Sequence, residues 1–248
     1  MEVLAVSHFC ITLDVDWAPD FVIDHVSEML LSTGVKATWM VTHDSPAIDR
    51  LRSFPDLFEL GIHPNFGAGS SHGTTVPEIL DSCLRMVPGA RVMRTHSLHQ
   101  SSPILDLVTQ LTPVVVDLSL FLPHHANLHP VIARTGPGRH LTRLPYRWED
   151  DHEMLEPNPD WSLNWLEQAS GLCILDFHPI HIALNSCSLE PYAELKRRVG
   201  GRLQDAQPHH LDGLITQGGG AATAFRRAMS MPAHSHVADI MAAIEGAA

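Results

Sequence analysis

The sequence predicts an α/β fold, a single irregular (β/α) barrel of about seven strands. Short apolar segments typical of buried strands alternate with segments of helical periodicity. The chain has 248 residues, a length at which α/β barrels form one domain, and 44% of them are hydrophobic. Aspartate, arginine or histidine follows several strand segments, where such barrels place their active sites. We therefore expect one catalytic domain over residues 1–248.

The strand segments are short apolar runs. The first reads HFCITLDV and the last reads LCILDF. Runs of this length, bounded by polar or turn residues, are typical of buried parallel strands. The predicted strands are 8–15, 35–42, 57–62, 92–96, 113–118, 142–146 and 172–177.

The helical segments lie between these strands, and two of them carry end signals. Gly34 follows the first helix as a C-terminal glycine cap, and Ser102 is expected to cap the helix that begins at Pro103. Residues 204–224 contain three consecutive glycines, so we expect a mobile insertion or lid there. The predicted helices are 21–32, 76–86, 103–111, 159–168, 191–199 and 237–244.

Charge and cysteine content limit the location and the partners. The formal net charge is −12 with both signs interspersed, which argues against nucleic acid or an anionic membrane as the partner. We expect a small-molecule or saccharide substrate, and the oligomeric state stays open. Residues 1–10 show no leader pattern and no window is apolar enough for membrane insertion, so we expect a cytoplasmic protein. The four cysteines form no C-x-x-C motif, which agrees with a reducing compartment.

The first polar pair follows the first predicted strand. Asp14 and Asp16 are one residue apart, and residues i and i+2 of a strand share a face. Because buried carboxylates without partners are unfavourable, the pair indicates one metal ligand and one proton acceptor at the mouth of the barrel. The structural alternative is a cap or turn role for Asp16 and a salt bridge for Asp14.

Histidines can supply nitrogen ligands for such a site, and the chain has 18 of them. His63 ends the third predicted strand, and His72 follows a loop rich in glycine and serine that can fold back beside it. Asp16, His63 and His72 together would suit zinc with a position open for water. The alternative for His72 is an ordinary surface histidine in a loop.

Two further strand ends carry groups suited to proton transfer. Arg94 lies in the fourth strand segment, and a cation beside Asp14 would lower the pKa of that carboxyl and hold it ionised. The neighbouring His96 and His99 are left outside the assignment. His178 follows the last strand, a suitable place for a general acid.

The order of these motifs resembles the polysaccharide deacetylases, the family four carbohydrate esterases. Asp14–Val15–Asp16 resembles the first motif of that family, and residues 36–41, KATWMV, resemble the strand that follows it. Residues 59–63, ELGIH, are similar to the second motif. Residues 175–178, LDFH, are similar to the last motif, in which an apolar residue, here Leu175, precedes the catalytic histidine. The resemblance spans roughly residues 8–182 and also points to a bacterial branch associated with O-antigen-type saccharides.

Two motifs depart from the family pattern. The second usually has the form His-x-x-x-His, but Gly67 stands at its second position here, so the role shifts to His72. The third usually reads Arg-x-Pro-Tyr, whereas residues 95–97 after Arg94 are Thr, His and Ser. The backbone N–H of Ser97 would then form the oxyanion hole.

The fourth motif of the family is an acid near a tryptophan. It is matched loosely by Trp148 with Asp150 or Asp151. By this resemblance, either aspartate would orient His178 and raise its pKa.

The resemblance implies metal-assisted hydrolysis of a linear amide. Asp14 would take a proton from water, helped by Arg94, and His178 would protonate the departing amine. The substrate would be an N-acetylated or N-formylated amino sugar or a related small molecule. One divalent ion, zinc or a similar metal, would be held by Asp16, His63 and His72.

Two other functions stay open. A phosphohydrolase of the haloacid-dehalogenase type also uses Asp-x-Asp after an apolar strand. That class has threonine or valine where Ala18 stands here, and it would leave His63, His72 and His178 without a role. The second alternative is a deacetylase-like barrel that has lost catalysis and only binds its ligand.

Overall fold

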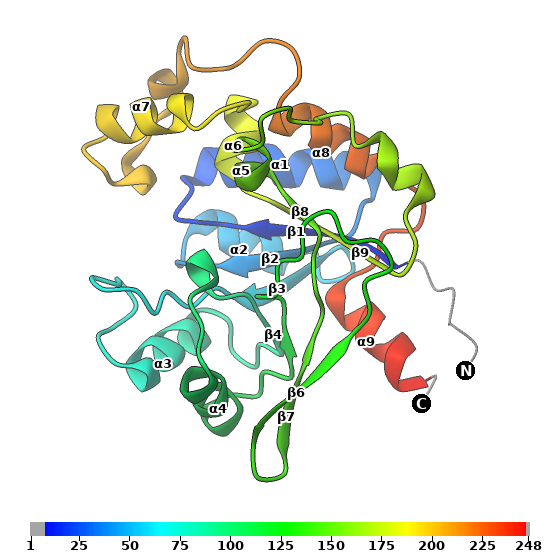
Figure 1. The fold of residues 1–248 in the computed structure, drawn as a ribbon. Helices are drawn as coiled ribbons and strands as arrows, with labels where there is room; N and C mark the ends of the chain where they lie inside the picture. The colour runs from blue at the N-terminus through cyan, green and yellow to red at the C-terminus, as the bar shows by residue number, and fades with distance from the viewer. Residues whose placement is uncertain (1–7, 247–248) are drawn as a thin grey trace.

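The computed structural model describes residues 8–246 and contains a curled half-barrel sheet with helices packed around it (Figure 1). The sheet has nine strands in the order β6-β7-β5-β4-β3-β2-β1-β9-β8. Neighbouring strands are parallel, except that β6 and β7 form an antiparallel hairpin. The strands are β1 (His8–Asp14), β2 (Ala37–Val41), β3 (Phe58–Ile62), β4 (Val92–Met93), β5 (Val116–Asp117), β6 (Val131–Gly136), β7 (Arg139–Arg143), β8 (Trp148–Glu149) and β9 (Leu172–Phe177).

Helices cover the sheet from several sides. α1, α6 and α8 pack together on one side, and α3 and α4 pack together on another (Figure 1). Short 3₁₀ turns occur at 96–98, 164–168, 203–205 and 208–211. The helices are α1 (Asp20–Thr33), α2 (Pro46–Arg52), α3 (Val76–Met86), α4 (Ser102–Leu111), α5 (Asp150–Glu153), α6 (Pro179–Leu184), α7 (Glu190–Arg198), α8 (Ala221–Met229) and α9 (Val237–Gly246).

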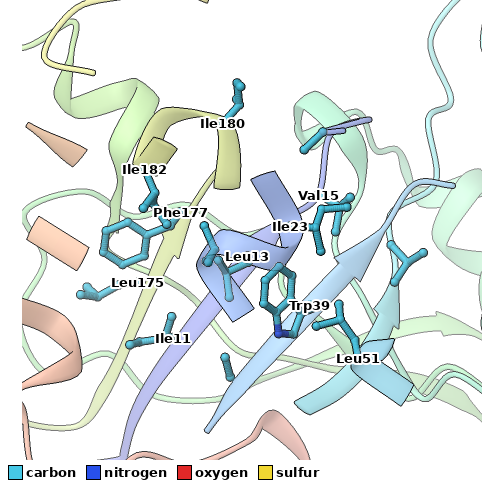
Figure 2. Packing of buried hydrophobic residues seen from close by; sticks show 14 of the residues in the cluster. Ile11, Leu13, Val15, Ile23, Trp39, Leu51, Leu175, Phe177, Ile180 and Ile182 are labelled. Carbon is cyan, nitrogen blue, oxygen red and sulfur yellow. The ribbon is translucent and has the colours of Figure 1, made fainter. Parts of the chain in front are cut away.

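The central strands are buried on both faces, and alternate residues belong to different clusters. Ile11 and Leu13 of β1 pack with apolar side chains of α1 and α6 (Figure 2). Cys10 belongs to a second apolar cluster on the opposite face of the sheet. Because strand side chains alternate, Thr12 and Asp14 lie on the same face as Cys10. This face is therefore apolar at its amino end and polar at the carboxyl ends of the strands.

The α/β barrel-like fold is confirmed, but the sheet has nine strands rather than about seven. The two additional strands are β6 and β8. β6 is largely exposed, and β8 has only two residues. Neither strand carries a buried apolar run, the sequence pattern that predicts a buried strand.

Some helix predictions also need correction. The cap of α4 is Ser101 rather than Ser102, because the Ser101 hydroxyl accepts a hydrogen bond from the backbone N–H of Ile104. Only 164–168 of the predicted helix 159–168 is helical, as a 3₁₀ turn. α2, α5, α6 and α8 were not predicted. Gly34 does cap α1, with φ of 66° in the left-handed region.

Residues 204–224 include the 3₁₀ turn at 208–211 and the first turn of α8. Leu211 and Ala222 in this segment are buried. The mobility of the segment, the single-domain organisation and the cytoplasmic location stay predictions. Between residues 8 and 246, none of the helices combines the length and the apolar character needed to span a bilayer.

Candidate active site

The polar residues at the strand ends meet in one cavity. Asp14 ends β1, while His63 and His178 directly follow β3 and β9. Parallel strands place these ends at one edge of the sheet, which is why residues far apart in sequence converge there. The cavity has a volume of about 270 Å³. Its lining includes Asp14, Asp16, His63, His96, Ser97 and His178.

Arg94 connects Asp14 to the buried interior of the sheet. Its Nη1 donates hydrogen bonds to Oδ1 of Asp14, at 2.8 Å, and to Oδ1 of Asp176. Its Nη2 donates to Oγ1 of Thr12 at 2.8 Å, and its guanidinium carbon lies 4.5 Å from the centre of the Tyr146 ring. The structure thus brings together Arg94 and Asp14, the pairing that the sequence analysis expected.

This network contains two buried carboxyls but only one guanidinium. Burial raises the pKa of Asp176 well above its usual range, and Arg94 offsets this only in part. Burial lowers the pKa of Arg94, but the carboxylates of Asp14 and Asp176 raise it above its ordinary value. The favoured state is a protonated Asp176, which leaves Arg94 and Asp14 as the ion pair.

A second group of side chains surrounds Asp16. Its Oδ1 lies 3.1 Å from Nε2 of His63 and 3.2 Å from Nδ1 of His96. These three potential ligand atoms lie within 4.8 Å of one another. Asp16 and Trp17 have φ of 44° and 54°, in the left-handed region that residues with a side chain rarely adopt. This strained turn after β1 directs the Asp16 carboxylate toward the two imidazoles.

The donor set around Asp16 fits a divalent metal ion. Zinc accepts one carboxylate and two imidazoles, and three protein ligands leave a position open, as in catalytic zinc sites. Burial raises the pKa of Asp16, but hydrogen bonds from His63 and His96 outweigh it and bring this pKa well below its usual value. Burial lowers the pKa of His96, but Asp16 outweighs it and brings this pKa above its ordinary value. A bound cation would replace the proton on His96.

His178 is held by Asp150 at two points. Its Nδ1 lies 2.7 Å from Oδ1 of Asp150, and its backbone N–H donates to Oδ2 of the same carboxylate at 2.9 Å. The other ring nitrogen, Nε2, lies 3.8 Å from Oδ2 of Asp16. Burial lowers the pKa of His178, but Asp150 and Asp151 outweigh it and bring this pKa well above its ordinary value. Of the two aspartates expected to orient His178, Asp150 makes the contact and Asp151 lines the cavity.

His72, the third metal ligand expected from the sequence, lies outside this donor set. Its Nε2 lies 2.7 Å from the carbonyl oxygen of Thr42, and its Nδ1 accepts a hydrogen bond from the backbone N–H of Asn65 at 3.2 Å. Its ring stacks on Trp17, with 5.6 Å between centroids. Backbone groups engage both ring nitrogens of His72. The histidine that lies beside Asp16 and His63 is His96 instead.

The remaining predicted support residues have different surroundings. Ser97 lines the cavity in a turn with φ of 53°. Trp148 is buried, and its indole N–H donates to Oε2 of Glu153 at 2.7 Å. The side chain of Leu175 packs in the core, while its carbonyl oxygen accepts a hydrogen bond from Thr12 at 2.9 Å.

Three residues at the site were not singled out from the sequence. Asp176 interrupts an otherwise apolar strand, and that irregularity was the available signal. Tyr146 and Glu149 lie close to Trp148 of the loosely matched fourth motif, but neither was assigned a role. The Tyr146 hydroxyl donates to Oε2 of Glu149, and burial raises the pKa of Glu149 to about 8.

A family model described as WbmS-like polysaccharide deacetylase matches residues 11–196. The chain belongs to the polysaccharide deacetylase family. The family resemblance inferred from the sequence motifs is therefore confirmed. Members of this family use a divalent metal ion, and the Asp16–His63–His96 donor set suits one.

Solved structures support the same assignment. A crystal structure from Bordetella bronchiseptica, described as a candidate polysaccharide deacetylase involved in O-antigen biosynthesis, is 34% identical. It covers 91% of each chain with a TM-score of 0.78, which confirms the deacetylase half-barrel fold.

More distant family members show weaker similarity. A CE4 pseudoenzyme from Bacillus anthracis is 15% identical over 70% of this chain and 55% of its own, with a TM-score of 0.42. The CE4 domain of a multidomain xylanase from the hindgut metagenome of Trinervitermes trinervoides is 12% identical over 96% of this chain and 91% of its own, with a TM-score of 0.46. The comparison with curated proteins gives no match.

Proposed function

We propose that this deacetylase-family chain is a metal-dependent hydrolase that removes an N-acetyl or N-formyl group from an amino sugar or a related small molecule. One observation carries the proposal. A carboxylate paired with arginine, a donor set for a divalent ion and a histidine paired with aspartate all line one cavity of about 270 Å³. Amide hydrolysis needs a proton acceptor, stabilisation of negative charge on the acyl oxygen and a proton donor for the amine.

Asp14 is the proton acceptor in this proposal. Its Oδ1 is occupied by Arg94, while its Oδ2 lies 3.4 Å from Nε2 of His63, beside the ligand group. A water molecule that attacks the acyl carbon there would give its proton to Oδ2. The hydrogen bond from the buried Arg94 keeps this carboxylate oriented before the reaction.

Asp16, His63 and His96 would hold the metal ion. When bound, a divalent ion supplies Lewis-acid chemistry, because it polarises an acyl carbonyl and acidifies water. The identity of the ion is part of the proposal, with zinc favoured by the mixed nitrogen and oxygen donors.

His178 is the proton donor. As the bond between the new oxygen and the acyl carbon forms and the carbon–nitrogen bond breaks, the amine nitrogen takes the proton from Nε2 of His178. Asp150 fixes the ring through Nδ1 and stabilises the imidazolium, so the proton is available at neutral pH. The products are a free amine and a carboxylic acid.

The substrate class rests on the family and on its relative. The Bordetella bronchiseptica structure is described as involved in O-antigen biosynthesis, which favours a saccharide substrate for this chain. The complete set of proton donor, proton acceptor and ligand groups supports an enzyme over a barrel that only binds ligand. Membership of the deacetylase family also argues against the phosphohydrolase alternative.

Release of free amine from a panel of N-acetylated and N-formylated amino sugars tests the proposal. The wild-type protein loaded with zinc should release amine, whereas Asp14→Asn and His178→Ala should lose roughly 10²–10⁴-fold in rate. His25→Gln, an exposed histidine on α1, is the matched control and should keep full activity. Full activity in Asp14→Asn and His178→Ala would refute the assigned roles.

A further inference from the structure

A second cavity meets the catalytic cavity at Asp16. It has a volume of about 480 Å³ and is lined in part by Asp16, Trp17, Tyr192, Lys196 and Arg202. Among the residues that the structure describes, Asp16 is the only acidic one in its lining. Because both cavities share Asp16, a molecule in the second cavity would extend directly to the proposed metal ligands.

Lys196 places a positive charge in the lining of this second cavity. The chain has only two lysines, and the other one, Lys36, pairs with Asp239 at 2.8 Å. Within residues 8–246, no carboxylate oxygen lies within 4 Å of Nζ of Lys196, which lies instead 5.2 Å from the centre of the Tyr192 ring. Lys196 is exposed and has no carboxylate partner among the described residues, so in a chain of net charge −12 its ammonium group beside the active site is available to a negatively charged ligand.

Arg202 adds a second cation to the same cavity. Its Nε lies 3.5 Å from Oδ2 of Asp205, and the two side chains are 75% and 55% exposed. Ion pairs as exposed as this contribute little to stability, so Arg202 can exchange Asp205 for a ligand at low energetic cost. Both cations therefore remain available to an anionic group.

The catalytic cavity has a different set of charged groups. Asp14, Asp16, Glu149 and Asp151 all line it, together with histidines. A negative group on a substrate would meet two cations, Lys196 and Arg202, in the second cavity. The two cations thus favour the second cavity for the negatively charged end of a substrate.

Two aromatic rings connect the second cavity to the catalytic groups. Tyr192 packs edge-on against His181, with centroids 5.1 Å apart, and His181 packs against His178 at 5.5 Å. Trp17 packs edge-on against His96, with centroids 5.2 Å apart, and stacks on His72. Aromatic faces of this kind suit the apolar face of a sugar or a nucleobase.

We propose that the cavity of Lys196, Arg202, Trp17 and Tyr192 binds the anionic part of the substrate, so that the enzyme acts on a negatively charged saccharide. This inference rests on the proposed deacetylase function and specifies its substrate class. The negative charge is a carboxylate of a uronic acid or a phosphate of a nucleotide-linked sugar. The acyl group then lies on the Asp14 and His178 side of Asp16.

Binding measured without turnover separates this inference from the proposed function. The full chain carrying His178→Ala is loaded with zinc and titrated calorimetrically with N-acetylglucosamine, UDP-N-acetylglucosamine and an N-acetylhexosaminuronic acid. One of the two anionic probes should bind at least roughly tenfold more tightly than the neutral sugar, as expected for a hydrogen bond to a charged group. The probe that binds tightly identifies phosphate or carboxylate as the anion.

Variants show whether the affinity comes from this cavity or from the metal ion itself. Lys196→Gln should abolish the preference for the anionic probe, and Lys196→Arg should largely retain it. Arg197→Gln, an exposed neighbour on α7 that pairs with Glu194, is the matched control and should leave the preference unchanged. Equal affinity for all three probes, or a preference that survives Lys196→Gln, would overturn the inference whether or not the wild-type protein releases amine.

Discussion

The carboxylate of Asp150 holds His178 by both of its oxygens. Oδ1 lies 2.7 Å from Nδ1 of the ring, and Oδ2 accepts the backbone N–H at 2.9 Å. The second contact fixes the main chain at the end of β9, and the first fixes the ring. Asp150 therefore controls both the position of His178 and the affinity of its ring for a proton.

Asp150→Asn should lower kcat by roughly 10²–10⁴-fold, because the ring loses its oriented partner. The loss of the negative charge also lowers the pKa of His178. A general acid is active below its pKa, so the alkaline limb of the kcat/KM profile should move to lower pH. Asp56→Asn, at an exposed position, should leave the profile unchanged. An unchanged alkaline limb in Asp150→Asn would show that His178 is not the acid.

Two variants in the hydrogen-bond network of Arg94 should differ in their free energy of unfolding. Arg94→Met leaves the buried Asp14 carboxylate without its cation and should reduce the free energy of unfolding by about 3–5 kcal/mol. Asp176→Asn replaces a protonated carboxyl by a neutral side chain of similar shape and should change it by less than about 1 kcal/mol. Urea denaturation of both variants measures the difference. A loss in Asp176→Asn as large as that in Arg94→Met would mean that Asp176 is ionised.

The zinc affinity of two histidine variants shows whether His96, as in the structure, or His72, as predicted from the sequence, is the third metal ligand. His96→Ala should lower zinc affinity by at least about 100-fold, beyond the effect typical of residues that only orient a ligand. His72→Gln should keep stoichiometric zinc, because the His72 ring contacts backbone atoms and Trp17. Competition with a chromogenic chelator gives both affinities. Normal zinc affinity in His96→Ala would remove His96 from the donor set.

Glu149 should make the protein less stable as the pH rises. Burial raises the pKa of Glu149 from 4.5 to about 8, so between these values the folded protein holds a proton that the unfolded chain has released. Stability falls with pH wherever the folded state binds more protons, hence across this window. Glu149→Gln should therefore gain stability relative to wild type as the pH increases from about 5 to about 9. Parallel urea midpoints for the two proteins would contradict the raised pKa.

Much of the fold and part of the site could be predicted from local sequence. The carboxyl ends of parallel strands share one edge, so Asp14, His63, Arg94 and His178 could be placed together from their positions after apolar runs. β6, the outer strand of the β6–β7 hairpin, has no buried run, and such a strand is recognised only through its partner.

Which histidine lies beside Asp16 and His63 depends on tertiary packing. The loop after Gly67 returns toward α3, where Nδ1 of His72 lies 3.5 Å from Sγ of Cys83, and no local pattern sets that direction. Asp176 became interpretable only through the pairing of β1 with β9, which places it beside Thr12. The choice between Asp150 and Asp151 likewise required the position of α5.

An anomalous-scattering map from crystals of the zinc-loaded protein tests the proposed metal site most directly. It should show one ion bound by Asp16, His63 and His96, with Asp14 and His178 beside it. An ion bound by His72, or no ion at this edge of the sheet while amine release persists, would contradict the central claim of a metal-dependent hydrolase built on these three ligands.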